Sequence, residues 1–166
     1  MGEAASITIT QMMKEDMEQV LAIEHASFSQ PWSRNLFLSE FRSSSVSTLL
    51  VALWGDPALR QVVGYIVYWN VEDEMHILNL AVLHAFRRRG IARLLVLTGI
   101  RRAAKRGASR AFLEVRASNA AAQKLYSALG FTGSFVRRNY YDEPIEDAVI
   151  MTLEEGAFRT IGNEVT

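Results

Sequence analysis

The residues best suited to bind an anion lie in one stretch of the sequence, where arginines lead directly into a predicted helix. The stretch reads RRRGIAR over residues 87–93, and it follows an apolar segment with strand character over 74–83. The first backbone amides of a helix lack acceptors within the helix, and the helix dipole adds partial positive charge there. Gly90 would let a ligand approach the backbone because it has no Cβ, and the guanidinium groups would add charge. The sequence therefore predicts a site for a diphosphate-bearing ligand at residues 87–93.

Charge is balanced over the whole chain but not along it. The 166 residues include 18 Lys plus Arg and 18 Asp plus Glu. No acidic residue lies between Glu74 and Glu114, whereas that window holds half of the basic residues. A neutral protein with one basic window indicates a focused anionic ligand rather than a surface that coats nucleic acid. The alternative explanation of the window is a solvated helix face.

Apolar periodicity predicts the elements that must position this loop. Strands are expected over 6–10, 46–54, 61–70, 74–83, 110–115, 131–141 and 147–153, and helices over 13–28, 33–42, 90–106 and 118–129. Antiparallel hairpins dominate early, and one strand–helix–strand crossover lies in the middle. This order predicts an α/β protein with a mixed central sheet of about seven strands and about four helices on both of its faces.

Length and composition predict one domain over residues 1–155 and a flexible C-terminal tail over 156–166. The absence of cysteine excludes a disulfide framework, a cysteine metal site and a cysteine acyl-enzyme. The three histidines have no metal-binding spacing, so we expect no metal. No segment has the length of a membrane span and the start lacks a secretory leader, so we expect a cytoplasmic monomer that does not bind membranes.

The loop differs from the common nucleotide-binding motifs. No Lys-Ser/Thr pair follows Gly90 and no GxGxxG is present. The spacing RxxGxA over residues 87–92 instead resembles the pyrophosphate loop of the GNAT superfamily of N-acetyltransferases. The segment over 113–131, LEVRASNAAA and then LYxxLGF, is similar to the RimI-type branch of that superfamily, as are RRNYY at 137–141 and FxxPWS at 28–33.

The resemblance implies acetyl-CoA as the donor. Its pantetheine arm would pair with the backbone over residues 80–82 like an added strand, which requires the neighbouring strand to splay away. Its diphosphate would bind the arginine-rich loop. The implied cofactor-binding residues are Leu80, Ala81, Val82, Arg87, Arg88, Arg89, Gly90, Ile91, Ala92, Arg93, Asn119 and Tyr126.

The resemblance also implies a catalytic pair, Glu114 and Tyr126. Glu114 directly follows an apolar strand segment, where desolvation would make it a competent base that takes a proton from the incoming ammonium through water. Tyr126, two helical turns after Asn119, would protonate the leaving thiolate. The structural alternatives are an ion pair of Glu114 with Arg116 or another arginine and a purely packing role for the Tyr126 ring.

The implied reaction is direct transfer of the acetyl group to the N-terminal amino group of a protein, in particular the N-terminal alanine of a small-subunit ribosomal protein. Trp32, Glu74, Tyr140 and Tyr141 are candidate peptide-binding residues, and only one of the adjacent tyrosines can face a cleft. Three alternatives stay open: the same chemistry on another protein terminus or a small amine, a nucleic-acid-binding module using the Arg-rich segment 87–110, and a sensor that binds acyl-CoA without catalysis.

Overall fold

The computed structural model describes residues 6–164, and the chain divides into two compact units. Unit 1 comprises Met1–Tyr68 and Asn79–Gly99, and unit 2 comprises Trp69–Leu78 and Ile100–Thr166. The prediction of one domain over residues 1–155 stays a prediction. Among the described residues, no helix combines the length and apolar character that crossing a membrane requires.

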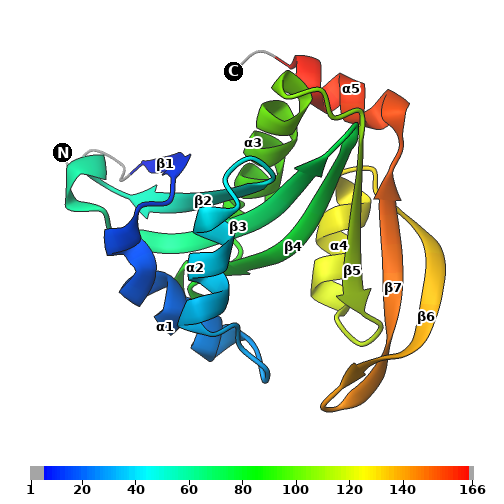
Figure 1. Ribbon diagram of the computed structural model, residues 1–166, viewed down its shortest axis with the longest axis horizontal. Coiled ribbons are helices and arrows are strands. Elements are labelled where there is room, and N and C mark those ends of the chain that lie inside the picture. The colour runs from blue at the N-terminus through cyan, green and yellow to red at the C-terminus, as the bar shows by residue number, and fades with distance from the viewer. Residues whose placement is uncertain (1–5, 165–166) are drawn as a thin grey trace. The chain divides into compact units, whose positions relative to one another are not determined.

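Seven strands form one mixed sheet in the order β1-β2-β3-β4-β5-β7-β6 (Figure 1). Their bounds are β1 Ile7–Gln11, β2 Ser47–Trp54, β3 Val62–Val71, β4 Glu74–Val82, β5 Arg110–Arg116, β6 Thr132–Asp142 and β7 Ile145–Leu153. β1 pairs with β2 antiparallel, β4 with β5 parallel, and β7 pairs antiparallel with both β5 and β6. The predicted mixed sheet and its central strand–helix–strand connection are confirmed.

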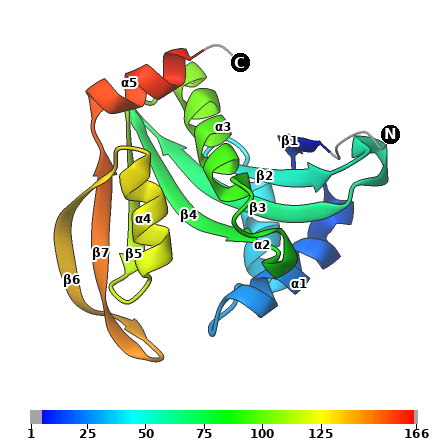
Figure 2. The ribbon, with the colours of Figure 1, turned by 180° about the vertical axis from the view of Figure 1, so that it is seen from behind.

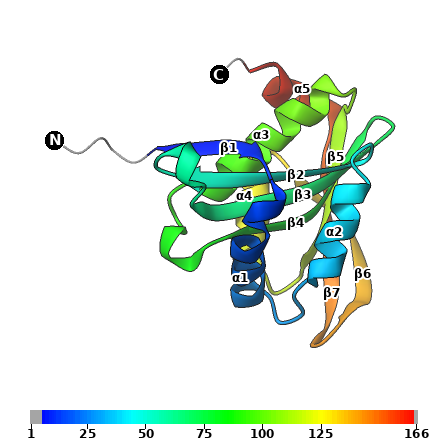
Figure 3. The same ribbon diagram turned by 60° about the vertical axis from the view of Figure 1, so that its left-hand side comes forward.

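In unit 1, α1 (Met17–Ser27) and α2 (Arg34–Arg42) lie on one face of β2, β3 and β4, and α3 (Ile91–Lys105) begins on the other face (Figures 2 and 3). β2 reads STLLVALW and is buried along nearly its whole length, as expected for a strand covered on both faces. Ser33 caps the start of α2, because the Leu36 amide donates to Ser33 Oγ at 3.2 Å.

In unit 2, α4 (Ala120–Ala128) lies beside β5 and β7 (Figure 2). Two polar residues, Ser118 and Asn119, precede α4 in the sequence. Asn119 is the cap, since its Oδ1 accepts from the Ala122 amide at 3.1 Å. Gly107, at φ +97°, ends α3 where the sequence predicts it.

The C-terminal segment corrects one prediction. Instead of a flexible tail from residue 156, the structure has a helix, α5 (Glu155–Asn163). Phe158 is fully buried and Ile161 is buried, so the two apolar residues three positions apart anchor one face of this helix. At Gly162 α5 approaches α3 so closely that an added Cβ would lie 2.9 Å from the Cβ of Ala104. A helix this short shows little periodicity in sequence, and its burial becomes visible only in the fold.

Candidate functional site

The predicted anion site begins where β4 ends in unit 1. A single 3-10 turn, His84–Phe86, follows the strand, and α3 starts at Ile91 after Gly90. Gly90 adopts φ +78°, a left-handed conformation that favours glycine, and a Cβ built there would meet nothing within 4 Å. The first helical turn closes with the Leu94 amide donating to Gly90 O at 3.0 Å. The predicted geometry, a strand leading through a short loop into a helix N-terminus, is therefore present.

The arginines of the loop have different surroundings. Arg87 is held by the protein itself, because its Nε donates to Val82 O at 3.0 Å and its Nη2 to Ser27 Oγ at 3.3 Å. The Arg89 guanidinium lies over the rings of Phe86 and Trp54, 5.0 and 5.5 Å from their centroids.

Positive charge at this end of α3 is not compensated locally. Across residues 6–164, none of the four arginines at 87, 88, 89 and 93 forms an ion pair with a carboxylate. Arg88 and Arg93 are exposed and make no described contact within the protein. Together with the free amides of the helix start, they form a positively charged surface suited to a phosphate group.

The strand backbone before the loop meets the requirement for pairing with a ligand. The parallel ladder between β4 and β5 runs from Glu74–Arg110 to Ile77–Leu113. Leu80, Ala81 and Val82 lie beyond the end of this ladder, while the side chains of Ala81 and Val82 are buried. Packing can therefore use these side chains while the backbone on that edge stays available to a ligand.

Glu114, the predicted base, lies near the end of β5 in unit 2, paired through its backbone register with Ile150 of β7. Its side chain is exposed, so the expected desolvation is wrong: strand alternation points it away from the buried neighbours Leu113 and Val115. The alternative ion pair with Arg116 is absent from the described residues, because Arg116 binds Glu146 instead, at 3.3 Å. Glu114 is therefore a carboxylate that water and an amine can reach.

Tyr126, the predicted acid, is 6% exposed in α4, and its ring packs edge-on against Phe131 with centroids 5.5 Å apart. Burial raises the pKa of Tyr126 above its usual value, and the nearby Tyr141 phenol adds to the effect. The phenol therefore keeps its proton throughout the neutral range. Both the acid role and the packing role are compatible with this burial.

Tyr141 of β6 connects the two predicted catalytic residues electrostatically. Burial and then the charge of Glu114 raise the pKa of Tyr141 to about 12. The guanidinium of Arg116 lies 4.1 Å from the centre of the Tyr141 ring and opposes this shift. Tyr140 is 44% exposed and Tyr141 is partly buried, but their ring centroids lie 5.1 Å apart, so the two rings are in contact and do not lie on opposite faces of the strand. The regular alternation behind the expectation of a single cleft-facing tyrosine is absent here, because the register of β6 shifts between Arg137 and Tyr141.

Sequence reasoning missed the contacts that hold Tyr141 in place. Besides Glu146, Arg116 donates to Pro144 O at 3.1 Å, and Glu146 Oε2 accepts from the Ser118 amide at 2.7 Å. Hydrogen bonds from Ser118 and Arg116 lower the pKa of Glu146 below its usual range. These contacts fasten the end of β5 to the β6–β7 turn. No sequence signal reveals them, because the partners lie about 30 residues apart.

Two other predicted site residues serve the fold in the structure. Glu74 accepts from Arg110 Nη2 at 2.8 Å and lies 2.8 Å from His76 Nε2, at the start of β4. Asn119 uses its side-chain oxygen to cap α4. Their predicted contacts with peptide and cofactor stay predictions.

A second missed group is Glu24 of α1, which is 1% exposed. Its carboxylate accepts from the Trp32 amide at 2.8 Å, from Asn79 Nδ2 at 2.9 Å and from the Tyr65 hydroxyl. The sequence does contain a signal, because Glu24 lies four residues after Val20 on the apolar face of its helix.

Comparison with known proteins decides the family. The model of the acetyltransferase (GNAT) family matches residues 16–131. The chain belongs to this family. The predicted resemblance is thereby confirmed, and with it the expectation of an acetyltransferase. GNAT acetyltransferases use acetyl-CoA as the acetyl donor.

Relatives of this GNAT acetyltransferase share most of its length. It is 36% identical over 148 residues to the ribosomal protein bS18-alanine N-acetyltransferase of Salmonella typhimurium, covering 88% of this chain and 96% of that protein. The crystal structure of the ribosomal-protein-S18-alanine N-acetyltransferase from Escherichia coli has a TM-score of 0.80 at 33% identity, covering 90% and 94% of the two chains. Ard1 from Thermoplasma volcanium has a TM-score of 0.79 at 27% identity, with 89% and 97% covered. The predicted fold class is confirmed by these structures.

Proposed function

We propose that this acetyltransferase transfers the acetyl group of acetyl-CoA to the N-terminal alanine of ribosomal protein bS18. The observation that carries the proposal is the similarity, over nearly the full length of both chains, to proteins named for that reaction in Salmonella typhimurium and Escherichia coli. The segments that predicted the RimI-type branch lie within the region of the family match or directly after it.

Donor binding follows from the geometry of unit 1. The diphosphate of acetyl-CoA would accept hydrogen bonds from the first amides of α3, with Arg88 and Arg93 supplying charge. Gly90 leaves the approach open, since apart from Gly90 and its two neighbours in the chain no protein atom lies within 4 Å of where its Cβ would be. The pantetheine amides would pair with the backbone of residues 80–82, beyond the end of the β4–β5 ladder.

The chemistry would be direct attack. Glu114 takes a proton from the substrate ammonium through water, and the freed amine nitrogen attacks the thioester carbonyl carbon. The new C–N bond forms, and the C–S bond breaks as Tyr126 gives its phenolic proton to the departing thiolate. The second proton of the attacking nitrogen passes through water to the Tyr126 phenolate, which leaves a neutral amide and restores the phenol. An exposed Glu114 that forms no ion pair within residues 6–164 and a Tyr126 that keeps its proton both support these roles.

Of the candidate peptide-binding residues, Tyr141 and Trp32 have the most support. Tyr141 lies within the electrostatic reach of Glu114, and the backbone of Trp32 is held by a partly buried hydrogen bond to Glu24. Tyr140 is exposed next to Tyr141, with ring centroids 5.1 Å apart. Glu74 is the weakest of the four, because Arg110 and His76 already bind its carboxylate.

A thiol-release assay with peptides that differ only in the first residue tests the substrate. The bS18 N-terminal peptide beginning with alanine should give the highest kcat/KM, and blocking its α-amino group should abolish turnover. Similar rates for all first residues, or faster turnover of a small amine, would contradict the proposed acceptor.

A further inference from the structure

The buried carboxylate of Glu24 stands out because the proposed chemistry does not use it. It belongs to α1 and lies within unit 1, as do its three hydrogen-bond donors. No Lys, Arg or His among the described residues forms an ion pair with it. Burying an ionised carboxylate is costly even when it is hydrogen-bonded, and an apolar side chain would serve packing alone at least as well. The question is therefore what this carboxylate holds in place.

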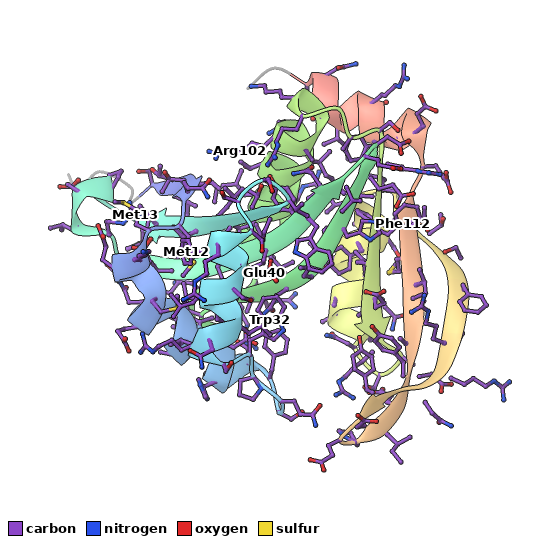
Figure 4. All side chains as sticks on the ribbon, in the orientation of Figure 1. Met12, Met13, Trp32, Glu40, Arg102 and Phe112 are labelled. Carbon is purple, nitrogen blue, oxygen red and sulfur yellow. The ribbon has the colours of Figure 1, made fainter. Side chains whose placement is uncertain are left out.

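One of its oxygens holds the segment between α1 and α2. Oε1 accepts from the backbone amide of Trp32, at 2.8 Å, in a stretch that has no regular secondary structure. The Trp32 ring packs against Phe37 with centroids 5.2 Å apart, and Phe37 packs edge-on against Tyr65 at 5.8 Å. Figure 4 labels Trp32 near the start of α2. Trp32 is thus fixed at its backbone by Glu24 and at its ring by Phe37.

The other oxygen of Glu24 binds β4, the strand that precedes the arginine-rich loop, and its neighbour β3. Oε2 accepts from the Tyr65 hydroxyl and from Asn79 Nδ2, the latter at 2.9 Å. Asn79 is buried and stands directly before Leu80, where the proposed pantetheine-binding backbone begins. One carboxylate group therefore connects a predicted peptide-binding residue to the strand that would bind the donor.

We propose that Glu24 is a positioning residue that sets the Trp32 segment against β4 and thereby determines how tightly the acceptor peptide binds. The inference rests on the proposed function for its substrate. Glu24 itself cannot touch the substrate, because it is 1% exposed. Its effect must pass through Trp32.

Glu24→Gln distinguishes the hydrogen bond to the Trp32 amide from the hydrogen bonds to Tyr65 and Asn79. A carboxylate only accepts, and all three neighbours can donate to it. The glutamine oxygen can keep the two donors at the Oε2 side, which leaves its NH2 facing the Trp32 amide, donor against donor. The substitution therefore releases the Trp32 segment while the size of the buried side chain stays the same.

In Glu24→Gln we expect KM for the peptide to change and KM for acetyl-CoA to stay nearly the same. Loss of one buried hydrogen bond should raise KM for the alanine peptide about five- to tenfold, with KM for acetyl-CoA within about twofold of wild type. Tyr65→Phe is the matched control, because it removes a donor from the same carboxylate and leaves the Trp32 bond. Its Tm should fall as in Glu24→Gln, while its peptide KM should stay within about twofold of wild type. Equal changes in both variants would show a merely structural role and overturn the inference.

A second measurement is independent of activity. In a background with Trp54→Phe and Trp69→Phe, fluorescence reports Trp32 alone among the three tryptophans. Glu24→Gln should make Trp32 more accessible to acrylamide, whereas Tyr65→Phe should not. Unchanged quenching in Glu24→Gln would overturn the inference. If the wild-type enzyme acetylates no alanine peptide, the proposed acceptor is wrong, and quenching still decides whether Glu24 holds this segment.

Phe37→Leu tests the same inference without changing Glu24, in case Glu24→Gln does not fold. It weakens the support of the Trp32 ring and should raise both acrylamide quenching and peptide KM. Increased quenching with an unchanged peptide KM would show that the position of Trp32 is irrelevant to the acceptor, and the inference would fail.

Discussion

At the scale of single residues, the two proposed catalytic groups differ in their exposure to solvent. Glu114 lies on the exposed face of β5 and can exchange protons with water, whereas Tyr126 is buried in α4 and retains its proton. Tyr141 lies within the electrostatic influence of both. A base open to solvent and a shielded acid are suited to opposite proton transfers in one reaction.

Glu114→Gln should remove the base while keeping the shape of the side chain. We expect kcat with the alanine peptide to fall at least about 100-fold, because general-base catalysis contributes this much. Acetyl-CoA affinity, measured by calorimetry, should change by less than about twofold. A turnover within about twofold of wild type would show that Glu114 is not the base.

Tyr126→Phe tests whether the buried phenol donates a proton or only packs. Removing the hydroxyl should slow transfer by at least about tenfold and leave acetyl-CoA affinity nearly unchanged. A more activated thioester with a better leaving group should recover part of the lost rate, since it needs less protonation. If affinity for acetyl-CoA collapses instead, Tyr126 is a binding or packing residue.

At the scale of elements, the start of α3 depends on a backbone conformation that side chains disfavour. Gly90→Ala forces a Cβ onto φ +78°, which should lower the free energy of unfolding by about 1 kcal/mol. The same Cβ enters the space proposed for the diphosphate, so acetyl-CoA affinity should fall as well.

Gly55→Ala is the matched control for this variant. Gly55 has φ +72° and also has no atom within 4 Å of its missing Cβ, but it lies in the turn after β2. It should show the same loss in urea unfolding with unchanged acetyl-CoA binding. Equal loss of affinity in both variants would remove the support for a diphosphate at Gly90.

The C-terminal helix is the element that sequence periodicity failed to predict. Phe158 is fully buried, so Phe158→Ala should reduce the free energy of unfolding by about 3–5 kcal/mol, measured in urea. Arg159→Ala, on an exposed neighbour, should change it by less than about 0.5 kcal/mol. Equal stability of the two variants would mean that α5 does not pack as described.

At the scale of the whole molecule, buried phenols make stability depend on alkaline pH. Burial raises the pKa of Tyr65 and Tyr126 above the ordinary value of 10.0, and that of Tyr141 to about 12. Above pH 10 the unfolded chain therefore loses tyrosine protons that the folded chain keeps. The contribution of these groups is complete below pH 10 and declines as pH rises.

Urea unfolding between pH 9 and 11.5 should show this decline. Each buried phenol contributes a slope of up to about 1.4 kcal/mol per pH unit, so Tyr126→Phe should flatten the decline. Tyr140→Phe, at an exposed position, is the control and should keep the wild-type slope. A stability that stays constant up to pH 11.5 would contradict the burial of these phenols.

Most of the elements, and the family, could be predicted from local sequence. Gly90, Gly107 and Ser33 mark helix ends through their own backbone or side-chain chemistry, so their roles are readable without the fold. The exposure of Glu114 could not be predicted, because it depends on which face of β5 is covered. The Arg116–Glu146 pair and the hydrogen bonds of Glu24 with Tyr65 and Asn79 could not be predicted either, because the partners lie 30, 41 and 55 residues apart in the chain.

By itself, the sequence determined the alternation of strands and helices, the arginine-rich loop before α3 and the membership in the GNAT family, because each depends on residues close together in the chain. Only the tertiary structure decided that Arg87 binds the Ser27 hydroxyl, that Glu114 is open to water and that the last helix is packed by Phe158. Burial and hydrogen-bond partners are properties of the folded packing, where groups tens of residues apart compete for the same space and the same donors.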